Sequence, residues 1–405
     1  MFFGENRITP LKDRCCGCGA CEQICAKHAI TMRRDEEGFM YPVLDGSLCV
    51  ECGLCETVCP MRHADCAKAA QGKPYLAVNR DGKTLWQSSS GGIFSIIADW
   101  VLAKGGIVYG AAFDEHMRLR HVGVEDAQAL SELRGSKYLQ SDGCDVYTQI
   151  RNQLKNGRWV YYTGTGCQVA GLRLFLRKPY PNLICSDLIC HGTPSQKVFD
   201  WVVSEMERKY NGKIVKYQFR DKKVNGWSCS SSSSLRIGDK IKYVGYDPIM
   251  MAYFNAFISG TMNREACYTC PCTTVERTGD ITLSDYWGVK KYHKVENAYN
   301  GVSAILVNTE KGMSLLSELR DKMDLKETKI EWIADENKNL IQRTARPETR
   351  TSFYEELGKD PQMLMRKYQP TNLLRSYVVF QIKRLCRKNR LLYSVLLKVQ
   401  ELRRK

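Results

Sequence analysis

Eight cysteines near the start of the chain have a spacing that suits iron–sulphur chemistry. The pattern C-x2-C-x2-C-x3-C occurs twice, and its cysteines are Cys15, Cys18, Cys21, Cys25, Cys49, Cys52, Cys55 and Cys59. Three thiolates two residues apart let one loop surround three corners of a 4Fe-4S cluster, and the fourth ligand comes from elsewhere in the chain. Because two-cluster modules exchange the fourth ligand, we predict that Cys59 completes the first set and that Cys25 completes the second.

Other interpretations of these cysteines are weaker. Zinc also binds sets of four thiolates, but zinc sites rarely use three cysteines at two-residue intervals, and here that arrangement occurs twice. Cys16 and Cys66 fall outside the pattern, and we assign them no role. Over residues 12–62 the two copies resemble bacterial two-cluster ferredoxins, although Ala26 stands where that family usually has proline.

Six further motifs follow in a fixed order. A serine- and glycine-rich start of a helix can hold a phosphate, although serine is also a routine helix cap. The motifs are SSSGGIF (88–94), GSKYLQS (135–141), GTGCQVAGL (164–172), DLICHGTPS (187–195), CYTC (267–270) and DITLSDYWG (280–288). Taken together, this series resembles the beta subunit family of coenzyme F420-reducing hydrogenases and dehydrogenases over roughly residues 74–310.

The resemblance implies a bound FAD and a third 4Fe-4S cluster. The residues that it assigns to FAD are Ser89, Ser90, Gly91, Gly92, Ser136, Lys137 and Tyr138. The cysteines that it assigns to the cluster are Cys167, Cys190, Cys267 and Cys270, with Cys272 as a substitute ligand. The alternatives are buried free thiols for Cys167 and Cys190 and a zinc knuckle for the CYTC pair. Gly166 departs from the family, which usually has proline there.

Two residues in these motifs are candidates for a role in the reaction. The resemblance places Lys137 where it could hold a flavin phosphate or stabilise negative charge on the reduced ring; the alternative is a solvated loop lysine. His191 directly follows a predicted ligand and is a candidate proton donor near the flavin, but a hydrogen bond to the backbone is the commoner role. We assign Asp285, Tyr286 and Trp287 to packing and loop geometry.

Strands and helices are predicted to alternate along the chain, and these elements must position the motifs. Apolar runs predict strands at 74–79, 106–113, 158–164 and 182–190 and helices at 93–106, 146–157, 168–176 and 195–210, followed by a β-rich stretch with a hairpin within 213–246. The expected fold class is α/β (α+β overall), with a mixed sheet. No GxGxxG follows the first strand, so a nicotinamide site of the Rossmann type is not expected. The predicted domains are a two-cluster ferredoxin-like domain (1–66), a flavin domain (74–310) and a helical, basic C-terminal region (311–405).

Composition limits the class of protein. The 405 residues are 43% apolar and 26% charged, which is typical of globular proteins. No apolar run approaches the roughly 20 residues needed to span a bilayer, and the first residues do not resemble an export signal. Nineteen cysteines in such a chain favour reduced, metal-binding thiols over disulphides. We therefore expect a cytoplasmic protein.

The positive charge is concentrated at the C-terminus. The net charge is +16, and from Arg366 onward twelve basic residues face one acidic residue, Glu401. Residues 371–405 mix leucine and arginine at helical spacing, so they predict a basic amphipathic helix for an anionic membrane surface or an acidic partner. A solvated helix on the protein's own surface is the alternative. Nucleic-acid binding is not expected, because no known nucleic-acid motif accompanies the charge.

These features predict an iron–sulphur flavoprotein oxidoreductase. Electrons would pass from a redox donor, such as ferredoxin or a partner subunit, through the 4Fe-4S clusters to FAD and on to a small organic hydride acceptor. The resemblance suggests a deazaflavin-like or a polysaccharide-pathway substrate. The alternative is an electron-transfer subunit that has no substrate of its own and serves a partner enzyme. A radical enzyme that cleaves S-adenosylmethionine is not expected, because its C-x3-C-x2-C motif is missing.

Overall fold

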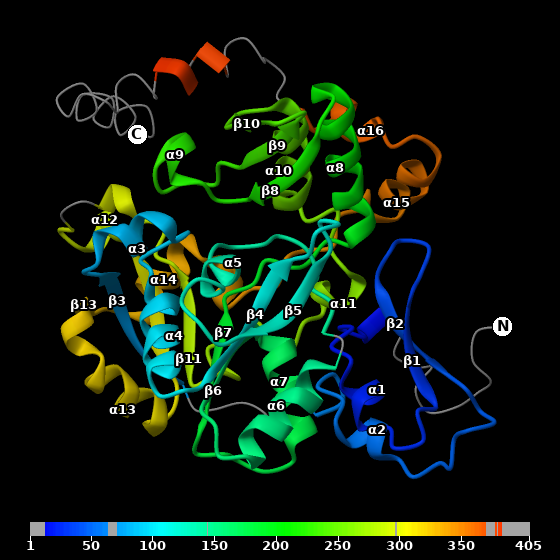
Figure 1. Cartoon of the computed structure of the whole chain (residues 1–405), viewed down its shortest axis with the longest axis vertical. Helices are drawn as coiled ribbons and strands as arrows, with labels where there is room; N and C mark the ends of the chain where they lie inside the picture. Colours follow the sequence, from blue (N-terminus) through cyan, green and yellow to red (C-terminus); the bar gives the residue numbers. More distant parts are fainter. Residues whose placement is uncertain are drawn as a thin grey trace.

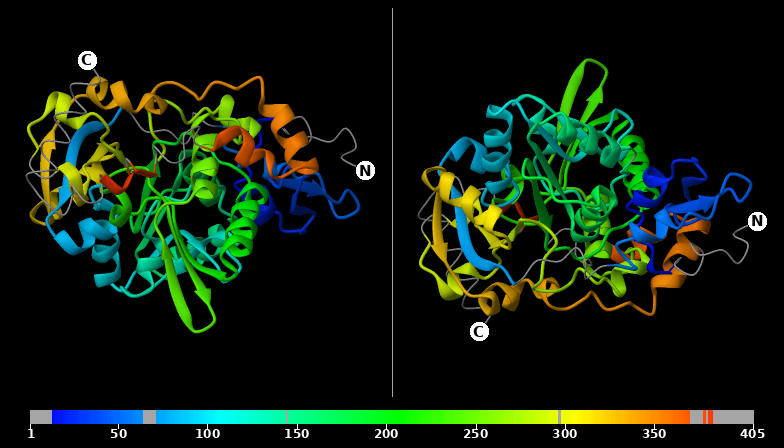
Figure 2. Two further views of the ribbon diagram at one scale, coloured as in Figure 1. Left: turned by 90° about the horizontal axis from the view of Figure 1, so that it is seen from above. Right: turned by 90° about the horizontal axis from the view of Figure 1, so that it is seen from below.

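The computed structural model consists of a small N-terminal module beside a larger α/β body (Figure 1). It describes residues 13–63, 71–143, 145–295, 298–369, 377–378 and 380–382. The two further views in Figure 2 also place the module at one end of the body. Cys66, Cys144, Cys386 and nearly all of the predicted basic helix at 371–405 lie outside the described residues.

The N-terminal module is built from two similar halves. Its elements are α1 (Ala20–Ile24), β1 (Ile30–Arg34), β2 (Met40–Leu44) and α2 (Leu54–Thr57), and the two strands form an antiparallel hairpin. Each helix begins after a glycine that lies between the second and third cysteine of a motif. These glycines, Gly19 and Gly53, have φ angles of 76° and 73°, which glycine adopts at little cost. The cysteine motif therefore fixes its own turn.

An eight-stranded mixed sheet forms the centre of the body. Its order is β13-β3-β12-β11-β7-β6-β4-β5; β4, β6, β7 and β11 are parallel to one another, and the strands at both ends are antiparallel to their neighbours. The bounds are β3 (Lys73–Asn79), β4 (Ile107–Phe113), β5 (Leu119–Val124), β6 (Val160–Thr165), β7 (Leu183–Leu188), β11 (Ile281–Asp285), β12 (Ser303–Val307) and β13 (Met323–Glu327). The predicted α/β class with a mixed sheet is confirmed. All eight strands and helices predicted between residues 74 and 210 are present.

Helices cover both faces of this sheet. On one face lie α4 (Ile93–Ala103) and α13 (Glu310–Glu318), and on the other lie α6 (Val146–Lys155) and α7 (Gly166–Leu176). Successive side chains of β6 point to opposite faces of the sheet and contribute to both hydrophobic cores. Tyr161 packs with α4, whereas Tyr162 packs with α7. The apolar cluster around α6 and α7 also includes Ala20 and Val58 of the N-terminal module. The module is thus held against the body by a shared hydrophobic core.

A second layer of elements lies above the sheet in Figure 1. A three-stranded antiparallel sheet, in the order β10-β9-β8, packs with α8, α10, α15 and α16 around one apolar cluster. The bounds are α8 (Gln196–Tyr210), β8 (Lys213–Gln218), β9 (Ser232–Ile237), β10 (Lys240–Val244), α10 (Pro248–Ile258), α15 (Arg350–Lys359) and α16 (Met363–Tyr368). The predicted hairpin is β9–β10.

Short helices complete the described chain. They are α3 (Gly82–Gln87), α5 (Leu130–Leu133), α9 (Lys222–Asn225), α11 (Glu265–Tyr268), α12 (Val289–Tyr292) and α14 (Ile330–Glu336), with 3-10 turns at Ala298–Asn300, Arg320–Lys322 and Lys338–Leu340. Within the described ranges, no helix combines the length and the apolar character that crossing a membrane requires.

The structure corrects one detail of the C-terminal prediction. The region from residue 311 was expected to be helical, but β13 pairs along its whole length with residues 75–79 of β3 and forms one edge of the main sheet. Its burial pattern explains the difference, because only Met323 of this strand is fully buried. A polar edge strand has no apolar run that sequence periodicity can detect.

Candidate redox sites

One cavity in the N-terminal module is lined by a complete predicted ligand set. Its volume is about 50 Å³, and Cys15, Cys18, Cys21 and Cys59 all lie in its wall. Burial raises the pKa of Cys21 well above its ordinary value, and negative charge on Cys15 and Cys59 raises it further. Four thiolates in so small a space repel one another, so a bound cation would be needed to hold them in the charged form.

The second N-terminal set is more open. Cys52 is exposed, whereas Cys25, Cys49 and Cys55 are partly buried. The backbone N–H of Ala29 donates to the sulphur of Cys25 over 3.3 Å. Such N–H contacts to sulphur are one means by which a protein tunes an iron–sulphur cluster.

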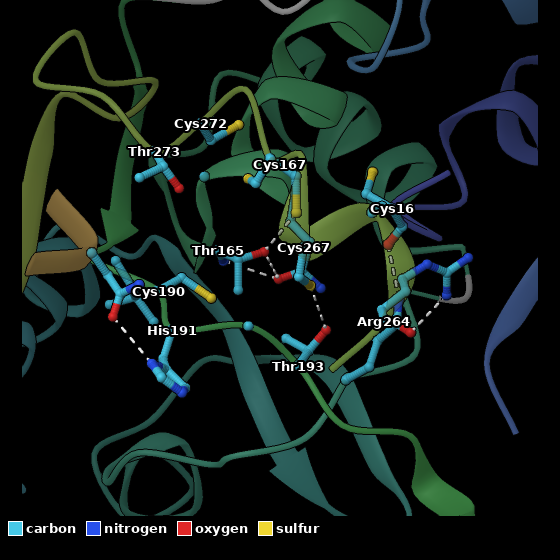
Figure 3. A pocket seen from close by; sticks show the side chains of 18 of the residues that line it. Cys16, Thr165, Cys167, Cys190, His191, Thr193, Arg264, Cys267, Cys272 and Thr273 are labelled. Atoms are coloured by element: carbon cyan, nitrogen blue, oxygen red, sulfur yellow. Dashed lines mark hydrogen bonds between the residues drawn. The ribbon is translucent and has the colours of Figure 1, made fainter. Parts of the chain in front are cut away.

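Six cysteines surround a second cavity, which lies in the body and has a volume of about 60 Å³. Figure 3 shows five of them around it, and the sixth is Cys270. Cys167 lies in the first turn of α7, directly after β6, and Cys190 lies two residues beyond β7. The other members come from α11 and the loop after it, apart from Cys16 of the N-terminal module. The cavity cysteines are Cys16, Cys167, Cys190, Cys267, Cys270 and Cys272.

The structure therefore brings the four cysteines predicted for the third site to one cavity and adds two more. Cys16, to which the sequence pattern assigns no role, lies in the wall of both this cavity and the N-terminal one. Cys272 packs against the start of α7, where a Cβ atom on Gly166 would lie 2.9 Å from the Cβ of Cys272. The departure from proline at position 166 thus makes room for the additional cysteine.

The thiols of the body cavity differ in acidity. Burial raises the pKa of Cys190 and of Cys267. In contrast, a hydrogen bond with the Cys272 thiol lowers the pKa of Cys270 to about 6. The hydroxyl of Thr165 lies 3.1 Å from the sulphur of Cys167. In the described part of the chain, no three Cys, His, Asp or Glu side chains are arranged to hold a single metal ion.

Buried polar side chains hold the loops of this cavity in place. The guanidinium of Arg277 donates to the carbonyls of Cys272 (2.8 Å) and Leu188 (2.7 Å). Its charge is balanced by Asp187, which lies on β7 and is completely buried. Because Leu188 ends β7 just before Cys190, the Arg277–Asp187 pair fixes two sides of the cavity at once.

A third, much larger cavity of about 580 Å³ adjoins the body cavity. The predicted FAD residues that line it are Ser89, Ser90, Gly92, Ser136, Lys137 and Tyr138. The hydroxyl of Ser89 accepts a hydrogen bond from the backbone N–H of Ser136 over 2.8 Å, so two motifs 47 residues apart meet here. The volume lies within the range of about 300–1,000 Å³ that is usual for ligand pockets.

Gly91 is the one predicted FAD residue that the cavity wall lacks. It faces the sheet instead, where its N–H donates to the Ser303 hydroxyl over 3.0 Å. A Cβ atom on Gly91 would lie 2.4 Å from the carbonyl oxygen of Ala77. This glycine lets the loop approach β3 and β12 closely, and its contact with a cofactor stays a prediction.

Two family models match the chain. Residues 157–332 match the model for the C terminus of the coenzyme F420 hydrogenase/dehydrogenase beta subunit, and residues 14–62 match the model for the 4Fe-4S dicluster domain. The chain thus joins a match to a 4Fe-4S dicluster domain to a match to the C-terminal part of the F420 hydrogenase/dehydrogenase beta subunit. Both predicted resemblances are thus confirmed, and the chain is an iron–sulphur electron-transfer protein related to these beta subunits. No curated protein matches its sequence.

Solved structures were also compared with the chain. One chain of the F420-reducing [NiFe] hydrogenase complex from Methanosarcina barkeri, in a study of xenon derivatization, is 15% identical and has a TM-score of 0.43. The comparison covers 68% of the present chain and 90% of that chain.

The polar groups of the two predicted catalytic residues, Lys137 and His191, already make hydrogen bonds within the body. The Nζ of Lys137 donates to the carbonyls of Glu132, Leu133 and Arg134 over 2.9–3.0 Å, so all three of its donors cap α5. Burial lowers the pKa of Lys137 to about 7. The two ring nitrogens of His191 contact Asn339 Oδ1 and the Phe257 carbonyl, each at 3.1 Å. Their catalytic roles stay predictions, and a role in catalysis would require these contacts to change.

Sequence reasoning missed the central ion pair of the beta-subunit domain. Arg220 follows β8, belongs to none of the six motifs, and binds the carboxylate of Asp285 through both terminal nitrogens at 2.7 and 3.0 Å. It also donates to the Ser89 carbonyl and lies over the ring of Trp287. Asp285 and Trp287 therefore do shape packing, as expected, but both also line the large cavity.

His121 is a second residue that carries no motif signal. It is buried beside the large cavity, where its Nδ1 lies 2.8 Å from the Ser141 hydroxyl and its Nε2 lies 3.0 Å from the Thr163 carbonyl. The amide of Gln168 donates to the same hydroxyl over 2.9 Å. Burial lowers the pKa of His121 to about 4, so the imidazole is neutral at physiological pH.

Proposed function

We propose that the chain is an oxidoreductase that depends on FAD and 4Fe-4S clusters and reduces a small organic hydride acceptor. A ferredoxin-like donor or a partner subunit supplies the electrons. The acceptor is a deazaflavin-like compound or an intermediate of a polysaccharide pathway. Bound FAD would convert single electrons into a transferable hydride.

The observation that carries the proposal is the connection of the three cavities. The N-terminal and body cavities share Cys16 and Met61 in their walls. The body cavity and the large cavity share Cys190, Thr165 and other side chains. Neighbouring cavities therefore have wall residues in common. Such an arrangement suits electron transfer between them.

The donor sets fit iron–sulphur clusters. The proposed ligands are Cys15, Cys18, Cys21 and Cys59 for the first cluster, Cys25, Cys49, Cys52 and Cys55 for the second, and Cys167, Cys190, Cys267 and Cys270 for the third. Cys272 remains a substitute in the third set, because it shares a hydrogen bond with Cys270. All twelve proposed ligands are free thiols in the structure.

The large cavity fits a flavin dinucleotide by the chemistry of its wall. Ser89, Ser90 and Gly92 present hydroxyl groups and a tight turn at the beginning of α4, where an anion is favoured. Arg134 adds a cation whose guanidinium donates to Ser95 and Gln87, which are both neutral. Aromatic and apolar side chains, including Trp287, supply the surface on which a planar ring could stack.

The location of the protein is a further part of the proposal. We expect it to work in the cytoplasm, with the basic C-terminal segment in contact with the inner face of the membrane. The support for this is the charge of that segment, where from Arg366 onward twelve basic residues face one acidic residue.

The test is the content of iron, acid-labile sulphide and released flavin per chain after anaerobic reconstitution. We expect about twelve irons, four for each cluster, and one FAD. Cys190→Ser should lower the iron content by about four. Cys185→Ser is the matched control, because this buried cysteine lies outside the three cavities, and it should retain all the iron. Eight irons without flavin in the wild-type protein would contradict the proposal and favour the electron-transfer subunit.

A further inference from the structure

Arg264 is a fully buried cation at the junction of the N-terminal module and the body. Its side chain is 1% exposed. The guanidinium donates to the carbonyls of Cys15 and Met40 and to the side-chain oxygen of Gln140, the last two over 2.8 and 3.0 Å. The guanidinium carbon, Cζ, lies 4.0 Å from the centre of the Tyr41 ring. These groups orient the guanidinium, but all of them are neutral.

The other buried arginines of the described chain each have a carboxylate. Arg220 pairs with Asp285, Arg277 with Asp187, and Arg350 with Glu37. No carboxylate contacts Arg264 among the residues that the structure describes. A buried charge without a counter-charge is strongly destabilising, and arginine cannot lose its proton as a buried lysine can. The counter-charge must come from another kind of group.

Apart from the phenol of Tyr41, whose pKa burial raises to about 12, the groups around Arg264 that can become anionic are cysteine sulphurs. Arg264 lies in the wall of the body cavity and is bonded to the backbone of Cys15, a proposed ligand of the N-terminal cavity. Figure 3 shows Arg264 beside this cavity, on the same side as Cys16.

The backbone at Gly17 allows this arrangement. A Cβ atom there would lie 2.9 Å from a terminal nitrogen of Arg264 and 2.5 Å from the amide nitrogen of Gln140. That amide nitrogen donates to the carbonyl of Cys16 over 2.9 Å. Glycine between two cysteines of the motif thus lets the guanidinium and the amide approach the cysteine loop directly.

We propose that Arg264 is a positioning residue that supplies the counter-charge for the two neighbouring 4Fe-4S clusters and raises both of their reduction potentials. This inference rests on the proposed function, since it requires clusters in the N-terminal and body cavities. Reduction adds negative charge to a cluster that four thiolates already make anionic, so a fixed cation stabilises the reduced form. The interaction is strong because the site is buried and screened little by solvent. The more exposed cluster of the second N-terminal set should feel little of it.

The experiment is an anaerobic redox titration of the full-length, reconstituted protein, followed by low-temperature EPR. Arg264→Gln should lower two of the three midpoint potentials, each by an amount that corresponds to about a tenfold weaker reduction equilibrium, or about 59 mV for a one-electron couple. Arg264→Lys keeps the charge and should restore most of the wild-type values. Gln140→Glu keeps Arg264 but places a carboxylate beside it, so it should lower the same two potentials.

The matched control is the double variant Arg350→Gln/Glu37→Gln, which removes an equally buried arginine together with the carboxylate that balances its charge. It should leave all three potentials unchanged. Full iron content with unchanged potentials in both Arg264→Gln and Gln140→Glu would overturn the inference and leave the proposed function intact. An equal shift in the double variant Arg350→Gln/Glu37→Gln would also overturn it. A wild-type protein without iron in the body cavity would instead refute the proposed function.

Discussion

The buried pair of Asp187 and Arg277 gives the sharpest test of how the body cavity is held together. Asp187 is completely buried on β7 and accepts hydrogen bonds from the hydroxyls of Thr282 (2.5 Å) and Thr278 (3.0 Å). Arg277 lies 3.2 Å from it and holds the carbonyls of Cys272 and Leu188. We predict that Asp187→Asn, which preserves size but removes the charge, loosens the cavity and lowers stability.

The expected loss of stability follows from the burial of the Asp187–Arg277 pair. Breaking a buried ion pair by removing one partner costs about 3–5 kcal/mol, because the other charge stays buried. At about 2–4 °C for each kcal/mol, the melting temperature should fall by on the order of 6–20 °C. The matched control is Asp324→Asn, which breaks the pair with Arg80, whose members are 57% and 67% exposed. An exposed pair contributes about 0–1 kcal/mol, so this variant should melt within about 4 °C of the wild type.

The assay is thermal unfolding of anaerobically purified protein, followed by circular dichroism, together with the iron content before heating. Asp187→Asn should melt early and lose iron, whereas Asp324→Asn should change neither quantity appreciably. If both variants have the melting temperature of the wild type, Asp187 does not organise the cavity. An early melt with full iron content would show that the carboxylate stabilises the sheet without holding the cysteine loops.

Three further predictions use the same purified protein. Gly171→Ala should lower the melting temperature, because its Cβ would lie 3.0 Å from the sulphur of Cys18. Overpacking costs about 1–3 kcal/mol, which exceeds the gain of about 0.5–1 kcal/mol in helix propensity. The control is Gly358→Ala, whose Cβ meets no atom within 4 Å and which should raise the melting temperature slightly. Because the folded pKa of His121 is lowered to about 4 by burial, stability should be greatest above the unfolded pKa and fall by roughly 3 kcal/mol as pH drops from about 6.5 to 4. Unfolding of His121→Gln across that range should lack this loss, and an unchanged pH profile would contradict the burial argument. Cys16→Ser should keep its iron, because the proposed sets already supply four thiolates per cluster, but should change the EPR spectrum of the reduced protein; loss of about four irons would instead make Cys16 a ligand.

Local patterns explain what the sequence could predict. The cysteine spacing and the glycines inside it determine a turn within a few residues, so the two halves of the N-terminal module were predictable. The same holds for Cys167 and Cys190, because the carboxyl ends of the neighbouring parallel strands β6 and β7 meet at one edge of the sheet. In both cases the relevant contacts are close in sequence or follow from strand order.

The features that escaped prediction depend on long-range contacts or on ambiguous residues. Arg264 meets Cys15 across 249 positions, and Arg220 meets Asp285 across 65, and neither arginine stands in a motif. Gly91 was ambiguous for another reason, since a glycine in a loop can allow contact with a ligand or with the protein's own backbone. Only the structure shows that β3 and β12 occupy the space that a Cβ atom would need.

The position of the N-terminal module gives the two cysteine sets different surroundings. Ala20 and Val58 share a core with α6 and α7, and this contact turns the first set toward the body. The second set stays outside, where Cys52 is exposed and the neighbouring Leu48 and Val50 are 48% and 60% exposed. A free two-cluster module has no such asymmetry imposed on it. Under the proposed function, an external donor would therefore meet the second set, and electrons would leave through the first set, past Cys16 and Arg264, into the body.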